Sequence, residues 1–211
     1  MGNGPSLKKI DLGLIKGEIT FGLNRIYLLY PEINFRPNYL VSVNELVLEQ
    51  FAEDFKGLQG PLFMNWNQRD HFNPEAEKYL FLKVRLGLRD HFSPDITQPI
   101  STGGTVTFVA MQIAYYLGFQ EVVLVGVDHS FRQEGVPNLT ETRAQVEDVD
   151  HFHPDYFPKG SRWQIPDLRR SELAYQLARE AFEKDGRQIV DATLNGQCPV
   201  FKRIDYRTYF S

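Results

Sequence analysis

Residues 101–130, STGGTVTFVAMQIAYYLGFQEVVLVGVDHS, are the stretch that decides the fold of this chain. Small residues lead into an apolar helical pattern that stops at Gly118, and an apolar strand pattern then runs to Asp128. The start of a helix offers unpaired amides and a favourable dipole to an anion. In open α/β sheets, ligands also collect beyond the carboxyl ends of the strands. We therefore predict a binding site at this helix start and strand end. An ordinary capped helix followed by a buried strand fits the pattern equally well.

Composition narrows the class of protein. Of the 211 residues, 42% are hydrophobic and 24% are charged, which is typical of a soluble globular chain, and we expect residues 1–211 to form a single domain. The net charge of -4 gives no broad basic field, which argues against nucleic acid as a partner. The single cysteine, Cys198, excludes an intrachain disulfide and suits a reducing compartment. With no apolar run long enough to span a bilayer, we expect a cytoplasmic protein.

Strand and helix patterns alternate along the chain. Apolar strand patterns occupy 18–25, 39–43, 61–66 and 188–192, an edge-strand pattern occupies 80–86, and helical patterns occupy 45–55 and 167–184. This alternation predicts an α/β fold with a mostly parallel sheet covered by helices on both faces. Two of the strands run into asparagines, Asn24 and Asn44, whose amides could read a base or a ribose. The alternative for Asn44 is a helix cap.

The beginning of the sequence is unusual. The turn GNGPSL follows Met1 directly, although turns of this kind normally follow a buried strand. We expect the slot of that strand to be vacant or filled by another segment or chain. We also expect the sequence to be an N-terminally shortened record of a longer protein.

A long polar segment, 131–165, is predicted to form a lid over the cleft. It contains His151 and His153, which point to opposite sides if the segment is extended. Only one imidazole can then face a substrate, and we slightly favour His153 because Pro154 constrains its backbone. Acidic and histidine residues cluster here, but no three have the spacing of a standard metal site, so no metal is predicted.

Several motifs together carry a family resemblance. GNGPSL with the following KKIDL, the two strand-end asparagines, and ISTGG followed by LGFQEVVLVGVD resemble the bacterial sialyltransferases of glycosyltransferase family 42. They also resemble the wider group that includes the MptE-like domain and the flagellar motility accessory factors. The segment HFHPDYF with a later Gly and Trp looks more like the MptE-like group. This resemblance implies a Rossmann-like fold that binds a cytidine-monophosphate-activated sugar without a metal or other cofactor.

The resemblance also implies a set of site residues. The nucleotide and the donor sugar would be held by Asn3, Gly4, Ser6, Asn24, Asn44, Ser101, Thr102, Gly103, Gly126 and Asp128. The general base would be His151 or His153, and both are eligible. Ser130 stands where the sialyltransferases have a tyrosine that holds the leaving phosphate.

The function expected from this resemblance is a sialyltransferase-like glycosyltransferase. Its partners would be a nucleotide-sugar donor and a glycan acceptor, and we also expect a homo-oligomer and peripheral membrane association. One alternative is an MptE-like pterin diphosphokinase that uses ATP and magnesium. Another is a catalytically reduced accessory protein that binds nucleotide, which Ser130 and the absent first strand favour.

Overall fold

The larger sheet of the protein consists of four parallel strands. The structure is a computed structural model that describes residues 1–85, 87, 89–132, 135–144 and 147–211. The strands are β1 (Phe21–Leu23), β2 (Tyr39–Ser42), β3 (Leu62–Asn65) and β4 (Tyr79–Leu82), in that order. β4 lies at the edge of the sheet, as the alternating sequence predicted, and its Leu80 is 40% exposed.

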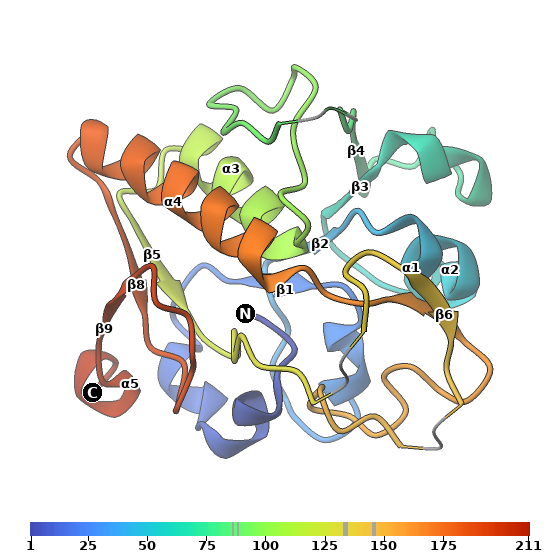
Figure 1. The fold of residues 1–211 in the computed structure, drawn as a ribbon, viewed down its shortest axis with the longest axis horizontal. Helices are drawn as coiled ribbons and strands as arrows, with labels where there is room; N and C mark the ends of the chain where they lie inside the picture. Colours follow the sequence, from blue (N-terminus) through green and yellow to red (C-terminus); the bar gives the residue numbers. More distant parts are fainter. Residues whose placement is uncertain (86, 88, 133–134, 145–146) are drawn as a thin grey trace.

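A second parallel sheet lies beside the first. It consists of β5 (Glu121–Leu124), β8 (Gln188–Asp191) and β9 (Lys202–Arg203), in the order β5-β8-β9. Residues 1–4 lie between β1 and β5 and join the two sheets (Figure 1). The Gly2 amide donates to the Val125 carbonyl at 2.7 Å, and the Met1 amino group donates to the Phe21 carbonyl at 2.8 Å.

Helices cover both faces of these sheets. On one face, α3 (Val106–Tyr116) packs against α4 (Leu168–Lys184) and over β1 and β2. The other face carries short helices: α1 (Glu45–Gln50), α2 (Ala52–Lys56) and the 3-10 turns Pro5–Lys9, Leu12–Ile15 and Ile26–Leu29. A further 3-10 turn spans Trp66–His71, a hairpin pairs β6 (Thr140–Thr142) with β7 (Arg162–Gln164), and α5 spans Tyr206–Tyr209. The predicted α/β class with a mostly parallel sheet is confirmed.

The helix ends follow from local sequence. Thr105 caps α3 by accepting a hydrogen bond from the Thr107 amide, and Gly118, with a φ of 87°, follows the end of that helix. Asp167 caps α4 through the Arg170 amide. The single helix expected over 45–55 is instead two helices that meet at Phe51, whose φ of -120° is not helical.

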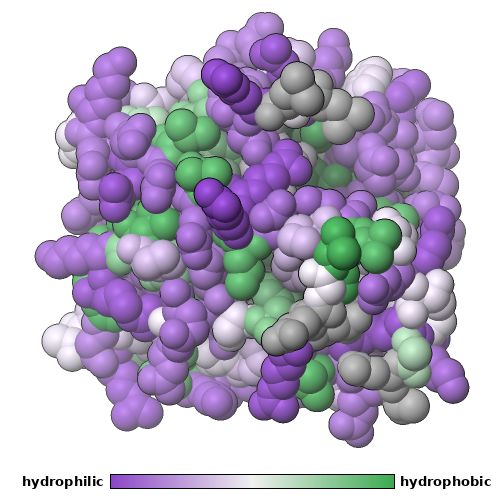
Figure 2. Space-filling model, in the orientation of Figure 1, coloured by the Kyte–Doolittle hydropathy of each residue, from purple (hydrophilic) through white to green (hydrophobic). Residues whose placement is uncertain are grey.

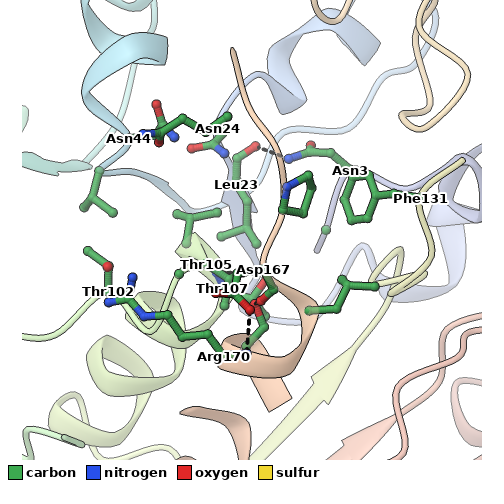
Figure 3. A pocket seen from close by; sticks show the side chains of 18 of the residues that line it. Asn3, Leu23, Asn24, Asn44, Thr102, Thr105, Thr107, Phe131, Asp167 and Arg170 are labelled. Atoms are coloured by element: carbon green, nitrogen blue, oxygen red, sulfur yellow. Dashed lines mark hydrogen bonds between the residues drawn. The ribbon is translucent and has the colours of Figure 1, made fainter. Parts of the chain in front are cut away.

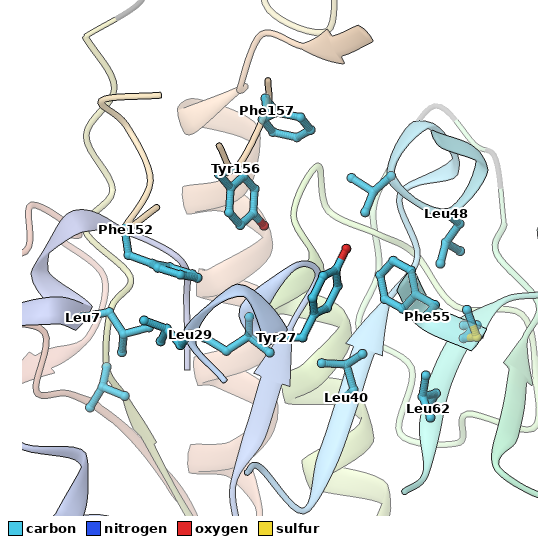
Figure 4. Close-up of a cluster of buried hydrophobic side chains, with 14 of the residues drawn as sticks. Leu7, Tyr27, Leu29, Leu40, Leu48, Phe55, Leu62, Phe152, Tyr156 and Phe157 are labelled. Atoms are coloured by element: carbon cyan, nitrogen blue, oxygen red, sulfur yellow. The ribbon is translucent and has the colours of Figure 1, made fainter. Parts of the chain in front are cut away.

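The largest hydrophobic cluster joins distant parts of the chain. Figure 4 shows Leu7, Leu29 and Leu40 in the same cluster as Phe152, Tyr156 and Phe157, which belong to the segment predicted to be a lid. These three aromatic residues are at most 8% exposed. That part of 131–165 is therefore anchored in the core, and the lid itself stays a prediction.

The surface carries no broad apolar band in the view of Figure 2, where hydrophilic residues dominate and hydrophobic ones form small separate groups. In the part of the chain that the structure describes, no helix has the length and apolarity needed to cross a membrane. The C-terminal tail docks on its own chain, since the buried Tyr206 donates its hydroxyl proton to the Asp11 carbonyl at 2.7 Å.

Candidate functional site

A polar cavity of about 590 Å³ opens at the carboxyl ends of the parallel strands. We call it the strand-end cavity. Its walls include the ends of β1, β2 and β3, the starts of α3 and α4, and residues from the 131–165 segment. Figure 3 shows asparagines on one side of this pocket and Thr102 with Arg170 on the other. This is the edge of the sheet where α/β proteins bind ligands.

Three consecutive strands each deliver an asparagine to the cavity. Asn24 follows β1, and its backbone has a left-handed conformation with a φ of 43°. Its side-chain oxygen accepts a hydrogen bond from the Ser42 hydroxyl at 3.1 Å. Asn44 follows β2, and its side chain caps α1 through the Val47 amide at 3.1 Å. Asn65 ends β3, is buried, and donates to the Val43 carbonyl. Asn65 also lines the cavity, although the sequence analysis did not propose it.

The glycine-rich turn supplies Asn3 and Gly4 to the same wall. The Asn3 amide nitrogen donates to the Leu23 carbonyl at 3.0 Å, and its buried carbonyl oxygen has no hydrogen-bond partner among the described residues. Gly4 passes so close to Asp128 that an added Cβ would lie 1.9 Å from that carboxylate. Both oxygens of Asp128 are engaged by Ser6, at 3.1 Å from the amide and 2.6 Å from the hydroxyl. Ser6 and Asp128 therefore hold the turn in place from behind the cavity wall.

Two helix N-termini and a cation meet opposite the asparagines. The first residues of α3, with 11 residues, and of α4, with 17 residues, line the cavity. Arg170 is held there by Asp90, which accepts from Nε at 2.7 Å and from Nη2 at 2.9 Å. The hydrogen bonds from Arg170 lower the pKa of Asp90 below its ordinary value. The N-terminal amides of α3 and the fixed guanidinium of Arg170 suit an anion such as a phosphate, whereas the start of α4 is already capped by the Asp167 carboxylate.

A histidine held by a buried carboxylate lies at the cavity wall. His151 Nδ1 lies 2.9 Å from Asp148 Oδ2, and the His151 ring stacks on Tyr156 with centroids 3.9 Å apart. Burial by itself raises the pKa of Asp148, because it disfavours the charged carboxylate. The hydrogen bond from His151 and the charges of His151 and Arg143 outweigh burial, so the pKa of Asp148 lies below its ordinary value. A carboxylate can only accept, so Nδ1 of His151 donates to Asp148, and in the neutral form of the ring Nε2 is left as an acceptor.

His153, the histidine that the sequence slightly favoured, lies elsewhere. Its Nδ1 accepts from the Asp155 amide at 3.1 Å, and it is not among the described residues that line the cavity. His129 does line the cavity, with its Nε2 at 3.0 Å from Glu172.

The proposed site residues fall into two groups. The structure brings together at the cavity Asn3, Gly4, Asn24, Asn44, Thr102 and His151. It places the others behind the wall or outside it: Ser6, Ser101, Gly103, Gly126, Asp128, Ser130 and His153. Ser101 is buried and lies 2.9 Å from His91, the Gly103 amide donates to Asp90, and Ser130 is exposed. The binding and catalytic roles of all these residues stay predictions.

Two of the residues that were missed had different signals in the sequence. Asn65 could have been found, because it repeats the strand-then-asparagine pattern of Asn24 and Asn44. Arg170 had no such signal, because its partner Asp90 lies 80 residues away in the sequence.

The fold is that of an α/β protein with a cavity at the carboxyl edge of its parallel strands, where α/β proteins bind ligands. Residues 1–134 match the family described as 6-hydroxymethylpterin diphosphokinase MptE-like. Because this match covers more than half of the 211 residues, the chain belongs to the MptE-like family. Searches among curated proteins and among solved structures gave no match. The match includes the asparagine wall and the start of α3, whereas Asp148, His151 and Arg170 lie beyond it.

Proposed function

We propose that this protein is a transferase with a Rossmann-like fold that binds a nucleotide-activated substrate in the strand-end cavity. It transfers the activated group to an acceptor hydroxyl, and the favoured donor is a CMP-activated sugar. Asn24, Asn44 and Asn65 read the nucleoside, since each amide can both donate and accept. The donor phosphate lies at the start of α3, near Arg170.

The observation that carries this proposal is the Asp148–His151 pair at the cavity wall. Its geometry is that of a general base whose second ring nitrogen is fixed by a carboxylate. The acceptor oxygen attacks the anomeric carbon, its proton passes to His151 Nε2, and the bond from that carbon to the phosphate oxygen breaks. The N-terminal amides of α3 and Arg170 stabilise the negative charge on the departing phosphate.

A second transfer reaction uses the same parts. The family description names a diphosphokinase, and the anion-binding side of the cavity also suits a polyphosphate donor such as ATP. Magnesium usually keeps several waters and takes one or two protein carboxylates together with phosphate oxygens. Glu45 and Asp150 are cavity carboxylates that could serve it in this way, and bound magnesium would neutralise phosphate charge.

Ligand-induced thermal shifts separate these functions. We would test CMP, CMP-sialic acid, UDP-sugars and ATP with magnesium, because a ligand that binds only the native state raises its melting temperature. Stabilisation by CMP and CMP-sialic acid supports sugar transfer, and stabilisation only by ATP with magnesium supports the diphosphokinase. Binding without turnover would instead identify a nucleotide-binding accessory protein, and stabilisation by none of these ligands would refute the nucleotide site.

A further inference from the structure

A second histidine–carboxylate pair lies at the strand-end cavity, apart from Asp148 and His151. His129 follows β5 and lines the cavity, and its Nε2 lies 3.0 Å from Oε1 of Glu172 on α4. The His129 side chain is only 6% exposed. Its ring centroid lies 6.0 Å from that of Tyr175, which also belongs to α4. His129 is therefore held against α4 at the edge where the parallel strands end.

His129 shares a wall with the groups that suit an anion. The Tyr175 hydroxyl lies 3.4 Å from Oγ1 of Thr105, which caps the start of α3. Arg170 reaches the same place, because a Cβ added at Gly104 would lie 3.3 Å from its Cδ. Figure 3 shows Thr105 and Arg170 together on one side of the pocket. The contacts thus run from His129 through Tyr175 to the start of α3.

One ring nitrogen of His129 is left for a ligand. A carboxylate only accepts, so Nε2 carries a proton and donates to Glu172. Nδ1 has no hydrogen-bond partner among the described residues, yet it is not one of their buried unpaired atoms, so solvent reaches it. With an anion at Nδ1, a protonated ring would have a donor on each nitrogen and an acceptor for each donor.

The backbone of His129 has an uncommon conformation. Its φ of 55° lies in the left-handed region, which costs a residue other than glycine roughly 1–3 kcal/mol. The preceding residue is fixed by distant parts of the chain: the Asp128 carbonyl accepts from the Gln197 amide at 2.8 Å, and its carboxylate accepts from Ser6. Residues held in such conformations by their surroundings cluster at ligand sites.

We propose that His129 is a second catalytic residue, which binds the donor phosphate: Nδ1 of the protonated ring donates to a phosphate oxygen, while Glu172 accepts from Nε2. This inference rests on the transferase function proposed above and assigns a residue that it does not use. When the bond from the anomeric carbon to the phosphate oxygen breaks, negative charge grows on the phosphate, and the adjacent imidazolium stabilises it. No proton leaves the His129 ring. His151 and His129 then have opposite tasks, since one accepts a proton and the other carries one throughout.

The test uses the 211-residue chain with ¹⁵N-labelled histidine and three probes: CMP, cytidine and inorganic phosphate. The Nδ1 signal of His129 in imidazole NMR spectra should shift with CMP or phosphate and not with cytidine, which lacks the phosphate. In the CMP complex, both ring nitrogens should be protonated.

His129→Asn removes the imidazole while keeping a residue that tolerates the left-handed backbone. It should weaken CMP binding by about 10- to 100-fold and leave cytidine binding unchanged, as expected for the loss of one hydrogen bond between charged groups. Calorimetric titration of the folded variant measures both.

Matched variants separate binding of phosphate from support of the fold. His153→Asn lies outside the cavity and should keep the wild-type affinity for CMP. Glu172→Gln retains an acceptor for Nε2 without the charge, and should weaken CMP binding by less than His129→Asn. An equal loss of CMP and cytidine binding in His129→Asn would overturn the proposal. So would an unprotonated Nδ1 in the CMP complex, which is measured on the wild type and does not depend on any variant folding.

Failure of the proposed donor gives a different result. If CMP does not bind but phosphate or ATP with magnesium shifts the Nδ1 signal, the phosphate role of His129 stands and the CMP-activated donor is wrong. If CMP binds and the Nδ1 signal does not respond, the nucleotide site stands and the role of His129 is wrong. An Nδ1 signal that responds to none of these probes also overturns the inference.

Discussion

The strand-end cavity and a second groove, of about 250 Å³ between β1 and β5, lie on the same parallel sheets, yet their walls differ in kind. The cavity is lined by side chains fixed by other parts of the protein, such as His151 by Asp148 and Arg170 by Asp90. The groove is lined mostly by apolar side chains of β1, β5 and α3. Residues 1–4 lie between the cavity and the groove. The amides of Gly2 and Gly4 donate to the carbonyls of Val125 and Gly126, and Met1 lines the groove. Side chains fixed in this way suit selective chemistry, which a mostly apolar wall does not offer.

Substituting the cavity histidine should have the largest effect. We expect His151→Ala to lower turnover with the accepted donor by roughly 10²–10⁴-fold, because the acceptor loses its general base. His153→Ala is the matched control: it lies two residues away, outside the cavity, and should keep near wild-type turnover. Initial rates at saturating donor would measure both, and equal rates for the wild type and His151→Ala would place the base elsewhere.

The buried Met1 amine should make stability depend on pH. Burial lowers its pKa from 8.0 to about 5, so the folded state disfavours the charged form. The unfolded chain binds more protons between pH 5 and pH 8, so stability falls as pH drops through this window, by at most about 4 kcal/mol. Urea unfolding of the free and acetylated chains at pH 5 and pH 8 would isolate the effect. A constant difference between the two forms would show that the amine is solvated in the folded protein.

The segment that separates cavity and groove should tolerate no added side chain. An alanine Cβ at Gly2 would lie 2.3 Å from the Gly126 carbonyl oxygen, so Gly2→Ala should destabilise the fold by about 1–3 kcal/mol. A Cβ at Gly17 meets nothing within 4 Å, which makes Gly17→Ala the control, with a change within about 0.5 kcal/mol. Chemical denaturation would compare them, and equal midpoints would mean that residues 1–4 are not packed between the sheets.

The smallest expected effect concerns Asn44, which caps α1 and is also proposed to bind the nucleotide. Asn44→Ala removes the cap of α1 and should cost about 1 kcal/mol, whereas Asn44→Ser keeps a capping oxygen and should cost much less. Both variants lose the amide that faces the cavity, so both should weaken binding of the stabilising nucleotide. Calorimetric titration beside thermal unfolding distinguishes the roles. Wild-type affinity in Asn44→Ser would make Asn44 a cap alone.

Much of the fold was predictable because its signals are local. The apolar runs of β2, β3 and β8, the cap of α4 at Asp167 and the end of α3 before Gly118 all depend on residues close in sequence. The 45–55 segment was predicted less well, because the break at Phe51 follows from packing. Its ring contacts Phe157 and the guanidinium of Arg25, which come from other parts of the chain.

The candidate site divides in the same way. By itself, the sequence determined that asparagines follow β1 and β2 and that small residues precede α3, since strand ends and helix starts are set by short patterns. Only the tertiary structure decided that His151 lines the cavity, because that choice depends on a buried Asp148 and on stacking with Tyr156. It likewise decided that Asp128 supports the turn at Ser6, 122 residues away in the sequence. Contacts across such separations leave no periodic trace in the sequence, because they form only when the chain folds.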